Sequence, residues 1–269
     1  SVLKTVNERS FFFTTRGVVT QEFCRYLRLS RATLGGDVAF YDKRFDDLKF
    51  NNNIEVKKIV VSDPHKPLDY LKPMQVLLEG LKNIFPSAEI VVAQHGLNKI
   101  VEDYCLKNSV KTVRIYEDRF NGLDIYDEAD LHVGFRVHAH VSALKRRKYS
   151  YLLEQDGRGC DYGATLERKI SVSNFLYPTR PVLTLKNLAR FLSSRPVIYR
   201  RFASVSPVYQ LLAIIREDSI TGFEKFSGLE KQILSFSKIK ICFCLSFGSS
   251  VKFSHLPLAF SNFFPSDTT

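Results

Sequence analysis

An arginine and two histidines occupy alternate positions in the stretch RVHAH, namely Arg136, His138 and His140. An arginine guanidinium is permanently charged and matches the oxygens of a carboxylate or phosphate, whereas a histidine exchanges a proton near neutral pH. Together these side chains suit an anionic substrate that undergoes proton transfer. The stretch follows the apolar run LHVGF and precedes a helical pattern, which indicates a strand passing into a helix.

The spacing predicts which of these side chains lie together. If the extended backbone of the strand continues into RVHAH, Arg136 and His138 lie on the same side, because side chains alternate along a strand. His140 joins them only if the extension continues. The N-terminus of the following helix adds partial positive charge for an anion. His132, inside the apolar run, is interpreted instead as a hydrogen-bonded structural residue.

Strand and helix patterns alternate along the chain before this stretch. Strands are predicted at 56–63, 88–94 and 110–118, with helices at 67–85, despite Pro73, and at 97–108. A short helix then leads into a strand over 123–135, and a further strand is predicted at 149–156. Such alternation predicts an α/β fold with a Rossmann-like parallel sheet, helices on both faces, and ligands at the carboxyl ends of the strands.

The two ends of the chain differ in character. At the start, a short buried strand at 8–17 and a helix at 18–29 flank a turn that contains Arg16. A glycine-rich loop is predicted at 156–163. We expect a Rossmann-like domain over residues 1–169 and a C-terminal extension over 170–269, with helices at 184–194 and 206–217 and an irregular remainder.

Charge and length restrict the partners. The formal net charge of +11 predicts attraction to a nucleic acid, a lipid surface or a phosphorylated small molecule. The basic run Lys145–Lys148 comes without a nucleic-acid-binding signature, so we interpret it as a solvated helix end and expect no specific nucleic acid partner. No apolar run reaches the roughly 18 residues of a transmembrane helix. The start lacks Met and a signal-peptide layout, which favours a fragment.

The cysteines do not indicate a metal site. Five cysteines form an odd set without a paired CxxC framework, which favours reduced thiols. The CFC at Cys242–Cys244 lacks a second pair of ligands, and its apolar setting is typical of a buried strand. We therefore predict neither a metal nor a cofactor. We expect the chain in the cytoplasm or peripherally at a membrane, or in the Golgi lumen if the source is eukaryotic.

Four segments in order resemble the polysaccharide pyruvyl transferase family. ADLHVGFRVHAHVSAL is similar to that family's acidic helix end, apolar strand and Arg-x-His-Ala turn. FFFTTRGVVTQEFCRYL, LGGDVAF and LLEQDGRG resemble its other segments, and together the four lie within residues 11–168. The resemblance implies half of a GT-B-type architecture, mainly the C-terminal Rossmann-like half, because the family's N-terminal half has no counterpart in this chain.

The resemblance also implies an activity. Family members transfer the enolpyruvyl unit of phosphoenolpyruvate to two sugar hydroxyls as a ketal and release phosphate, so the partners would be phosphoenolpyruvate and a glycan or sugar precursor. On this basis we assign Arg136 and Arg16 to anion clamping and His138 to acid/base catalysis. Arg158 is a further phosphate-binding candidate, and His140 is included among the substrate-binding residues.

Two alternatives stay open at this point. A glycosyltransferase of the same architecture would use Arg136 and Arg158 to hold the diphosphate of a nucleotide sugar. A non-catalytic domain would keep the fold without the site and bind polyanions in a salt-sensitive manner that survives replacement of His138. Phosphoenolpyruvate should stabilise a pyruvyl transferase, whereas a nucleoside diphosphate should stabilise a glycosyltransferase.

Overall fold

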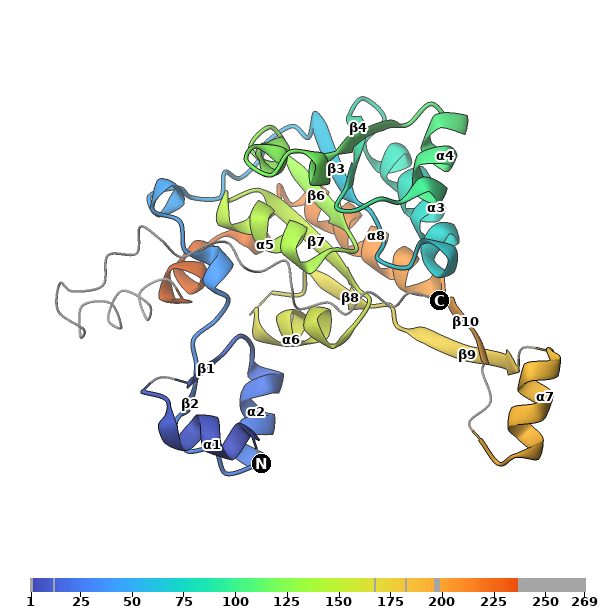
Figure 1. The fold of residues 1–269 in the computed structure, drawn as a ribbon. Helices are drawn as coiled ribbons and strands as arrows, with labels where there is room; N and C mark the ends of the chain where they lie inside the picture. Colours follow the sequence, from blue (N-terminus) through green and yellow to red (C-terminus); the bar gives the residue numbers. More distant parts are fainter. Residues whose placement is uncertain (1, 12, 167, 182, 196–198, 237–269) are drawn as a thin grey trace.

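The computed structural model describes residues 2–11, 13–166, 168–181, 183–195 and 199–236. Within this part of the chain, a six-stranded parallel sheet with the order β5-β4-β3-β6-β7-β8 forms the centre (Figure 1). Its strands are β3 (Lys58–Ser62), β4 (Glu89–Gln94), β5 (Lys111–Arg114), β6 (Leu131–Gly134), β7 (Tyr149–Glu154) and β8 (Ser171–Ser173).

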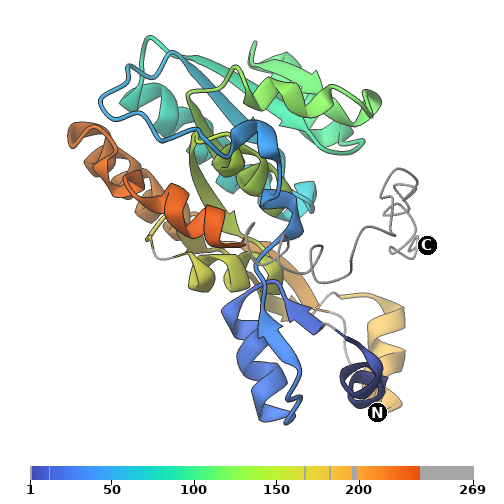
Figure 2. The same ribbon diagram turned by 90° about the vertical axis from the view of Figure 1, so that its left-hand side faces the viewer.

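Helices cover both faces of this sheet. Helices α3 and α4 pack against each other, α8 packs against α3, and α5 packs against α6 (Figures 1 and 2). Because β6 and β7 are covered on both faces, every residue of these strands is buried. The helices are α3 (Pro67–Ile84), α4 (Lys99–Lys107), α5 (Val137–Lys145), α6 (Gly157–Thr165) and α8 (Ser206–Ile220).

The strand order reverses at the middle of the sheet. From β3 the chain adds β4 and β5 on one side, and then returns to place β6, β7 and β8 on the other side. The loops that leave β3 and β6 therefore diverge, and such a reversal opens a crevice outside the carboxyl ends of the strands. The order and the flanking helices confirm the predicted Rossmann-like α/β sheet.

The N-terminal residues form a small unit beside α6. It contains α1 (Val2–Arg9), β1 (Phe13–Thr15), α2 (Val18–Tyr26) and β2 (Ala32–Leu34), and β1 pairs in parallel with β2. Asp161 of α6 caps α2, because its Oδ1 accepts a hydrogen bond from the backbone N–H of Val19 at 2.8 Å. The hydroxyl of Thr20 donates to Asp161 Oδ2 at 2.5 Å. The predicted strand and helix are both present here.

The predicted boundary at residues 169 and 170 falls inside the sheet. Strand β8 pairs with β7, and α8 packs across α3, β7 and β8. The Tyr151 hydroxyl of β7 donates to Asp218 Oδ2 of α8 at 2.6 Å, with both residues buried. The division into domains 1–169 and 170–269 therefore does not match a break in packing, because α8 covers apolar surface that the sheet would otherwise expose.

Two further predictions for this half have different outcomes. The expected glycine-rich loop at 156–163 is wrong, because these residues start α6 with Asp156 as its N-cap. The helices expected at 184–194 and 206–217 are present as α7 (Leu185–Leu192) and α8. An antiparallel pair, β9 (Leu176–Pro181) and β10 (Tyr199–Ala203), carries α7. Cys242–Cys244 and the rest of 237–269 lie outside the described residues. No described helix is long and apolar enough to cross a bilayer.

Candidate functional site

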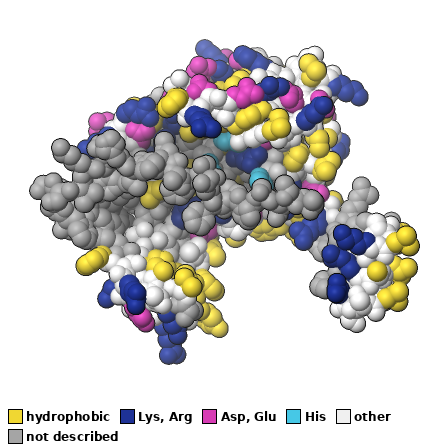
Figure 3. Space-filling view, viewed as in Figure 1, with side chains coloured by type: hydrophobic (Ala, Val, Ile, Leu, Met, Phe, Trp, Pro, Cys, Tyr) yellow, Lys and Arg dark blue, Asp and Glu magenta, His cyan; other side chains and the backbone are white. Residues whose placement is uncertain are grey.

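A cavity of about 220 Å³ lies at the carboxyl ends of β3, β4, β6 and β7. Histidine side chains lie beside basic ones in the centre of the face shown in Figure 3. The position is the one that the reversal of strand order predicts for a ligand. The residues that line the cavity are His65, His95, Phe135, Arg136, Val137, His138, Gln155, Asp156 and Arg158.

Arg136 marks the point where the extended backbone ends. Its φ of −104° and ψ of 118° are those of a strand, and α5 begins at the next residue. The alternation expected for RVHAH therefore stops at Arg136, and His138 and His140 are helical. Arg136 and His138 nevertheless line the same cavity, one from the end of the β6 loop and one from the first turn of α5.

The Arg136 guanidinium is held by the carboxylate of Asp63, which follows β3. Nε of Arg136 lies 3.1 Å from Asp63 Oδ1, and Nη2 lies 3.0 Å from Oδ2. The Asp63 side chain is fully buried, and it also accepts a hydrogen bond from the backbone N–H of His95 at 3.0 Å. A buried two-point pair of this kind fixes the guanidinium in one orientation. Arg136 is thus a positioned cation rather than a mobile one.

The environment of His65 and His138 in the cavity favours the neutral form of both imidazoles. Burial lowers the pKa of His65, and the charges of Arg136 and Arg158 lower it further. Nδ1 of His65 lies 3.0 Å from Nη1 of Arg136, a contact in which the ring nitrogen accepts. Burial likewise lowers the pKa of His138, although Asp37 opposes this effect. Neutral imidazoles can accept a proton from a substrate hydroxyl.

Arg158 reaches the cavity from the first turn of α6. Its Nη2 lies 2.6 Å from Asp156 Oδ2, and the other oxygen of Asp156 accepts from the backbone N–H of Arg158 at 2.9 Å. Burial acts to raise the pKa of Asp156, but the bonds from Arg158 outweigh it and the pKa is lowered. Because both side chains are about 40% exposed (39% and 42%), this pair can open more easily than the buried pair of Arg136.

Arg16 lies on the N-terminal unit, and its charge affects the pKa of His138. Its Nη1 is 3.9 Å from Asp37 Oδ2, and its guanidinium lies over the ring of Tyr162. The Tyr162 hydroxyl donates to the same oxygen of Asp37. The charges of Arg16 and Arg158 both lower the pKa of His138. Arg16 and Arg158 therefore approach His138 from separate elements, although Arg16 does not line the cavity itself.

His140 lies apart from this cavity. It is buried at 1% exposure, and its Nδ1 lies 2.7 Å from the hydroxyl oxygen of Ser150 on β7. The same hydroxyl oxygen lies 2.7 Å from Nδ1 of His132, whose Nε2 lies 3.0 Å from the oxygen of Ser62. Burial lowers the pKa of His140 to about 3. The structure thus places the predicted substrate ligand His140 in a buried network, and His132 is hydrogen-bonded as predicted.

Gln155 and His95 line the cavity in addition to the site residues assigned from the sequence. Gln155 follows β7 and accepts a hydrogen bond from the backbone N–H of His65 at 3.0 Å, while its Nε2 is buried without a hydrogen-bond partner. Nε2 of His95 lies 2.7 Å from the Tyr126 hydroxyl, and burial lowers the pKa of His95 to about 4. Their position at strand ends was the only available signal. Among the described residues, no group of three His, Cys, Asp or Glu side chains could hold a metal ion.

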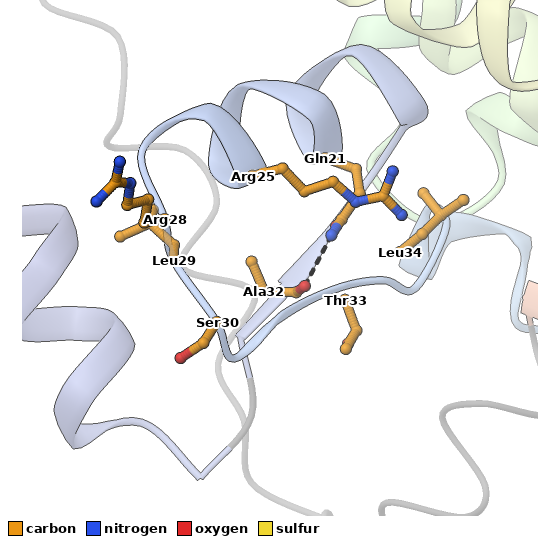
Figure 4. Close-up of a pocket in the computed structure, with 8 residues that line it drawn as sticks. All are labelled: Gln21, Arg25, Arg28, Leu29, Ser30, Ala32, Thr33 and Leu34. Carbon is orange, nitrogen blue, oxygen red and sulfur yellow. Dashed lines mark hydrogen bonds between the residues drawn. The ribbon is translucent and has the colours of Figure 1, made fainter.

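A larger cavity of about 520 Å³ lies on the N-terminal unit, between α2 and β2 (Figure 4). Gln21 crosses it and donates to the backbone oxygen of Ala32 at 2.7 Å. Arg25 and Arg28 are its cations, and it contains no titratable acid or base that works near neutral pH. We therefore take the smaller cavity as the candidate site, because only that one combines cations with histidines at the strand ends.

Comparisons with known proteins show similarities of fold. No family model matches the chain, and no curated protein sequence matches it. The UDP-GlcNAc 2-epimerase of Methanocaldococcus jannaschii, solved with UDP-GlcNAc and UDP, is 11% identical with a TM-score of 0.45, covering 88% of this chain and 61% of that one. MnaA of S. aureus, solved with UDP, is 12% identical with a TM-score of 0.46, covering 90% and 61%.

The wall teichoic acid polymerase TagF is also similar, at 9% identity and a TM-score of 0.37, covering 92% of this chain and 62% of TagF. The chain therefore spans about three fifths of the length of these structures. At these identities the similarity concerns the fold alone and assigns no ligand to the cavity.

Proposed function

We propose that the cavity at the strand ends binds phosphoenolpyruvate, and that the chain is part of a GT-B-type sugar-modifying transferase that passes the pyruvyl unit to a sugar as a ketal. The observation that carries the proposal is the meeting of Arg136, His138 and Arg158 around one cavity at the reversal of strand order. Cations there match the carboxylate and phosphate of the donor, and a neutral imidazole matches the hydroxyl that must lose a proton.

The size of the cavity favours a compact anion. At about 220 Å³ it is smaller than the roughly 300–1,000 Å³ of typical pockets for larger organic ligands. Phosphoenolpyruvate carries two anionic groups on three carbons, so both can meet cations within such a volume. A nucleotide sugar needs additional space for a base, a ribose and a hexose.

The reaction makes and breaks a small number of bonds. The C=C electrons of phosphoenolpyruvate take a proton at C3, which leaves C2 electron-deficient, and a sugar hydroxyl oxygen forms the first bond to C2. The bond from C2 to the phosphate oxygen then breaks and its electron pair leaves with the phosphate, after which a second hydroxyl oxygen bonds to C2. The two sugar hydroxyls release two protons. In the overall reaction one of these ends on the methyl group at C3 and the other on the phosphate.

The side chains divide these tasks. His138 accepts a hydroxyl proton, because its lowered pKa keeps the imidazole neutral before the donor binds. Arg158 exchanges Asp156 for the anion, since both side chains of that pair are about 40% exposed (39% and 42%). Arg16 adds positive charge from the N-terminal unit. Arg136 stays fixed on Asp63 through Nε and Nη2, while its Nη1 contacts Nδ1 of His65, and both residues line the cavity. Cations placed before the reaction stabilise the charge that develops on the departing phosphate.

Thermal unfolding with ligands tests the proposal. We expect phosphoenolpyruvate to raise the melting temperature of the protein, because a ligand that binds only the folded state stabilises it, and uridine diphosphate to have no effect. Arg158→Gln should abolish the rise, whereas the control Arg25→Gln, on the N-terminal unit, should keep it. Stabilisation by uridine diphosphate alone would reassign the site to a nucleotide-sugar enzyme. Stabilisation by neither ligand would leave a non-catalytic domain.

A further inference from the structure

Helix α7 presents its apolar side outward. Leucine and phenylalanine positions recur at helical spacing on one side of Leu185–Leu192, and their exposed fractions are large. Among the described residues of α7, Asn187 is the buried one, at 5% exposed, so no apolar side chain of the helix is covered. This is the reverse of an ordinary surface helix, whose apolar stripe faces the core. The exposed apolar residues are Leu183 (98%), Leu185 (86%), Leu188 (55%), Phe191 (70%) and Leu192 (75%).

The antiparallel pair of β9 and β10 carries this helix away from the central sheet. Figure 1 shows α7 at the far end of that arm. Along the outer edge of the arm's tip, hydrophobic side chains gather, while basic ones lie on the inner side (Figure 3). At the arm itself, Tyr177 of β9 and Phe202 of β10 are paired in register and half exposed. A large exposed apolar surface at the end of an arm is typical of a site that binds another protein or a membrane.

The positive charge of this segment indicates which kind of partner surface it binds. Residues 174–203 contain six basic residues and no acidic one: Arg180, Lys186, Arg190, Arg195, Arg200 and Arg201. Among those whose exposure the structure describes, Lys186 of α7, Arg195 just after it and Arg201 of β10 are exposed. A second copy of this chain would bring two such basic segments together, which like-charge repulsion opposes. An anionic surface would instead complement them.

We propose that α7 binds the surface of an anionic lipid bilayer. The apolar side enters the boundary between headgroups and acyl chains, and Lys186 and Arg195 remain among the phosphate groups. Eight residues of helix extend only about 12 Å, so α7 lies in the plane of the interface and does not span the bilayer. The inference rests on α7 and its arm alone and is independent of the ligand of the cavity.

A single introduced tryptophan tests the orientation of the helix, because the chain has no tryptophan of its own. In Phe191→Trp we expect the fluorescence to shift to the blue with vesicles of phosphatidylglycerol and phosphatidylcholine, and lipids brominated on their acyl chains to quench it. Phe120→Trp is the matched control, because Phe120 is 92% exposed and lies between η3 (Ile115–Glu117) and η4 (Gly122–Tyr126). An unshifted, unquenched Phe191→Trp, or equal changes in both variants, would overturn the proposal.

Vesicle sedimentation tests the energetic basis. We expect the unaltered protein to sediment with anionic vesicles and not with pure phosphatidylcholine. Leu188→Glu with Phe191→Glu should abolish binding, and Lys186→Glu with Arg195→Glu should weaken it about tenfold or more. Leu106→Glu, at an 80% exposed leucine of α4, should bind like the unaltered protein. Equal sedimentation of all variants would contradict the proposal. So would a lipid-free dimer that Phe191→Glu dissociates, because it would assign the apolar side to a second copy.

Discussion

The guanidinium of Arg136 and the carboxylate of Asp63 form a buried two-point ion pair across the middle of the sheet. The atom pairs Nε–Oδ1 and Nη2–Oδ2 are 3.1 and 3.0 Å apart, and Asp63 is fully buried. Asp63 follows β3 and Arg136 follows β6, so the pair joins the two strands at which the strand order reverses. It sets the distance between the loops that form two walls of the cavity.

Asp63→Asn should destabilise the protein strongly. The substitution keeps the shape of the side chain but removes the charge, which leaves the Arg136 guanidinium largely buried without its counter-ion. We expect the free energy of unfolding in a urea titration to fall by about 3 kcal/mol. Asp103→Asn, at an exposed position of α4, is the control and should change it by less than about 0.5 kcal/mol. Equal effects of the two changes would show that the buried pair does not stabilise the fold.

Stability should fall as the pH falls below the usual histidine pKa of 6.5. Burial lowers the pKa of His140 to about 3 and that of His95 to about 4. Between pH 6.5 and those values the unfolded chain binds protons that the folded chain does not, so the free energy of unfolding decreases. Each such histidine contributes up to about 1.4 kcal/mol per pH unit. Urea titrations between pH 7 and pH 4.5 measure the slope.

A pair of variants assigns part of that slope to His140. His140→Asn should reduce the slope, because one imidazole is missing from the unfolded chain. Ser150→Ala removes the hydroxyl that lies 2.7 Å from Nδ1 of His140 but retains the imidazole, so the slope should persist at lower overall stability. If the slope of His140→Asn equals that of the unaltered protein, His140 is not the buried neutral group described above.

Two glycines of α6 should respond in opposite ways to alanine. A Cβ on Gly163 would lie 2.1 Å from Glu154 Oε1 and 2.4 Å from Ser171 Oγ. Gly163→Ala should therefore lower the free energy of unfolding by about 1–3 kcal/mol. Gly157 has open space around its Cβ position, and Gly157→Ala should be neutral or stabilise by up to about 1 kcal/mol. Thermal unfolding compares them, and equal effects would refute the close contact of α6 with the sheet.

Helix α8 should prove to be part of the sheet domain. Ile215 is fully buried and Ile220 is 81% exposed, although both lie on α8. Ile215→Ala should cost about 2–4 kcal/mol of unfolding free energy, whereas Ile220→Ala should cost less than about 1 kcal/mol. A single unfolding transition is expected in both variants. A separate early transition in Ile215→Ala would instead support an independent C-terminal domain.

The strands of the sheet were predictable because parallel strands buried on both faces are apolar throughout. The cores of β3, β4 and β7 are such runs, and the helices between them have clear periodicity. Helix α6 was not predictable, because its glycines suggest a loop in isolation. Position 163 favours glycine because the side chains of Glu154 and Ser171 approach it closely. These neighbours come together only in the folded chain.

The candidate site was predictable only in part, because some of its contacts depend on the order of the strands in the sheet. The end of a strand indicates where ligands bind, so Arg136 and His138 were found, but the partner of an arginine depends on strand order. Asp63 lies 73 residues before Arg136 and pairs with it only because β3 and β6 are neighbours. The same applies to Arg146, which was expected to be solvated but is buried with its Nε 2.7 Å from Asp127 Oδ1.

The titration of His138 in the presence of phosphoenolpyruvate tests the central claim most directly. Nuclear magnetic resonance of the imidazole carbons gives the pKa of each histidine, and His138→Gln identifies the resonance. The pKa of His138 is lowered without ligand. A bound anion beside it should raise that pKa, while the buried His140 should not change. If saturating phosphoenolpyruvate leaves the pKa of His138 unchanged, the cavity does not bind the anion beside this histidine and the account is contradicted.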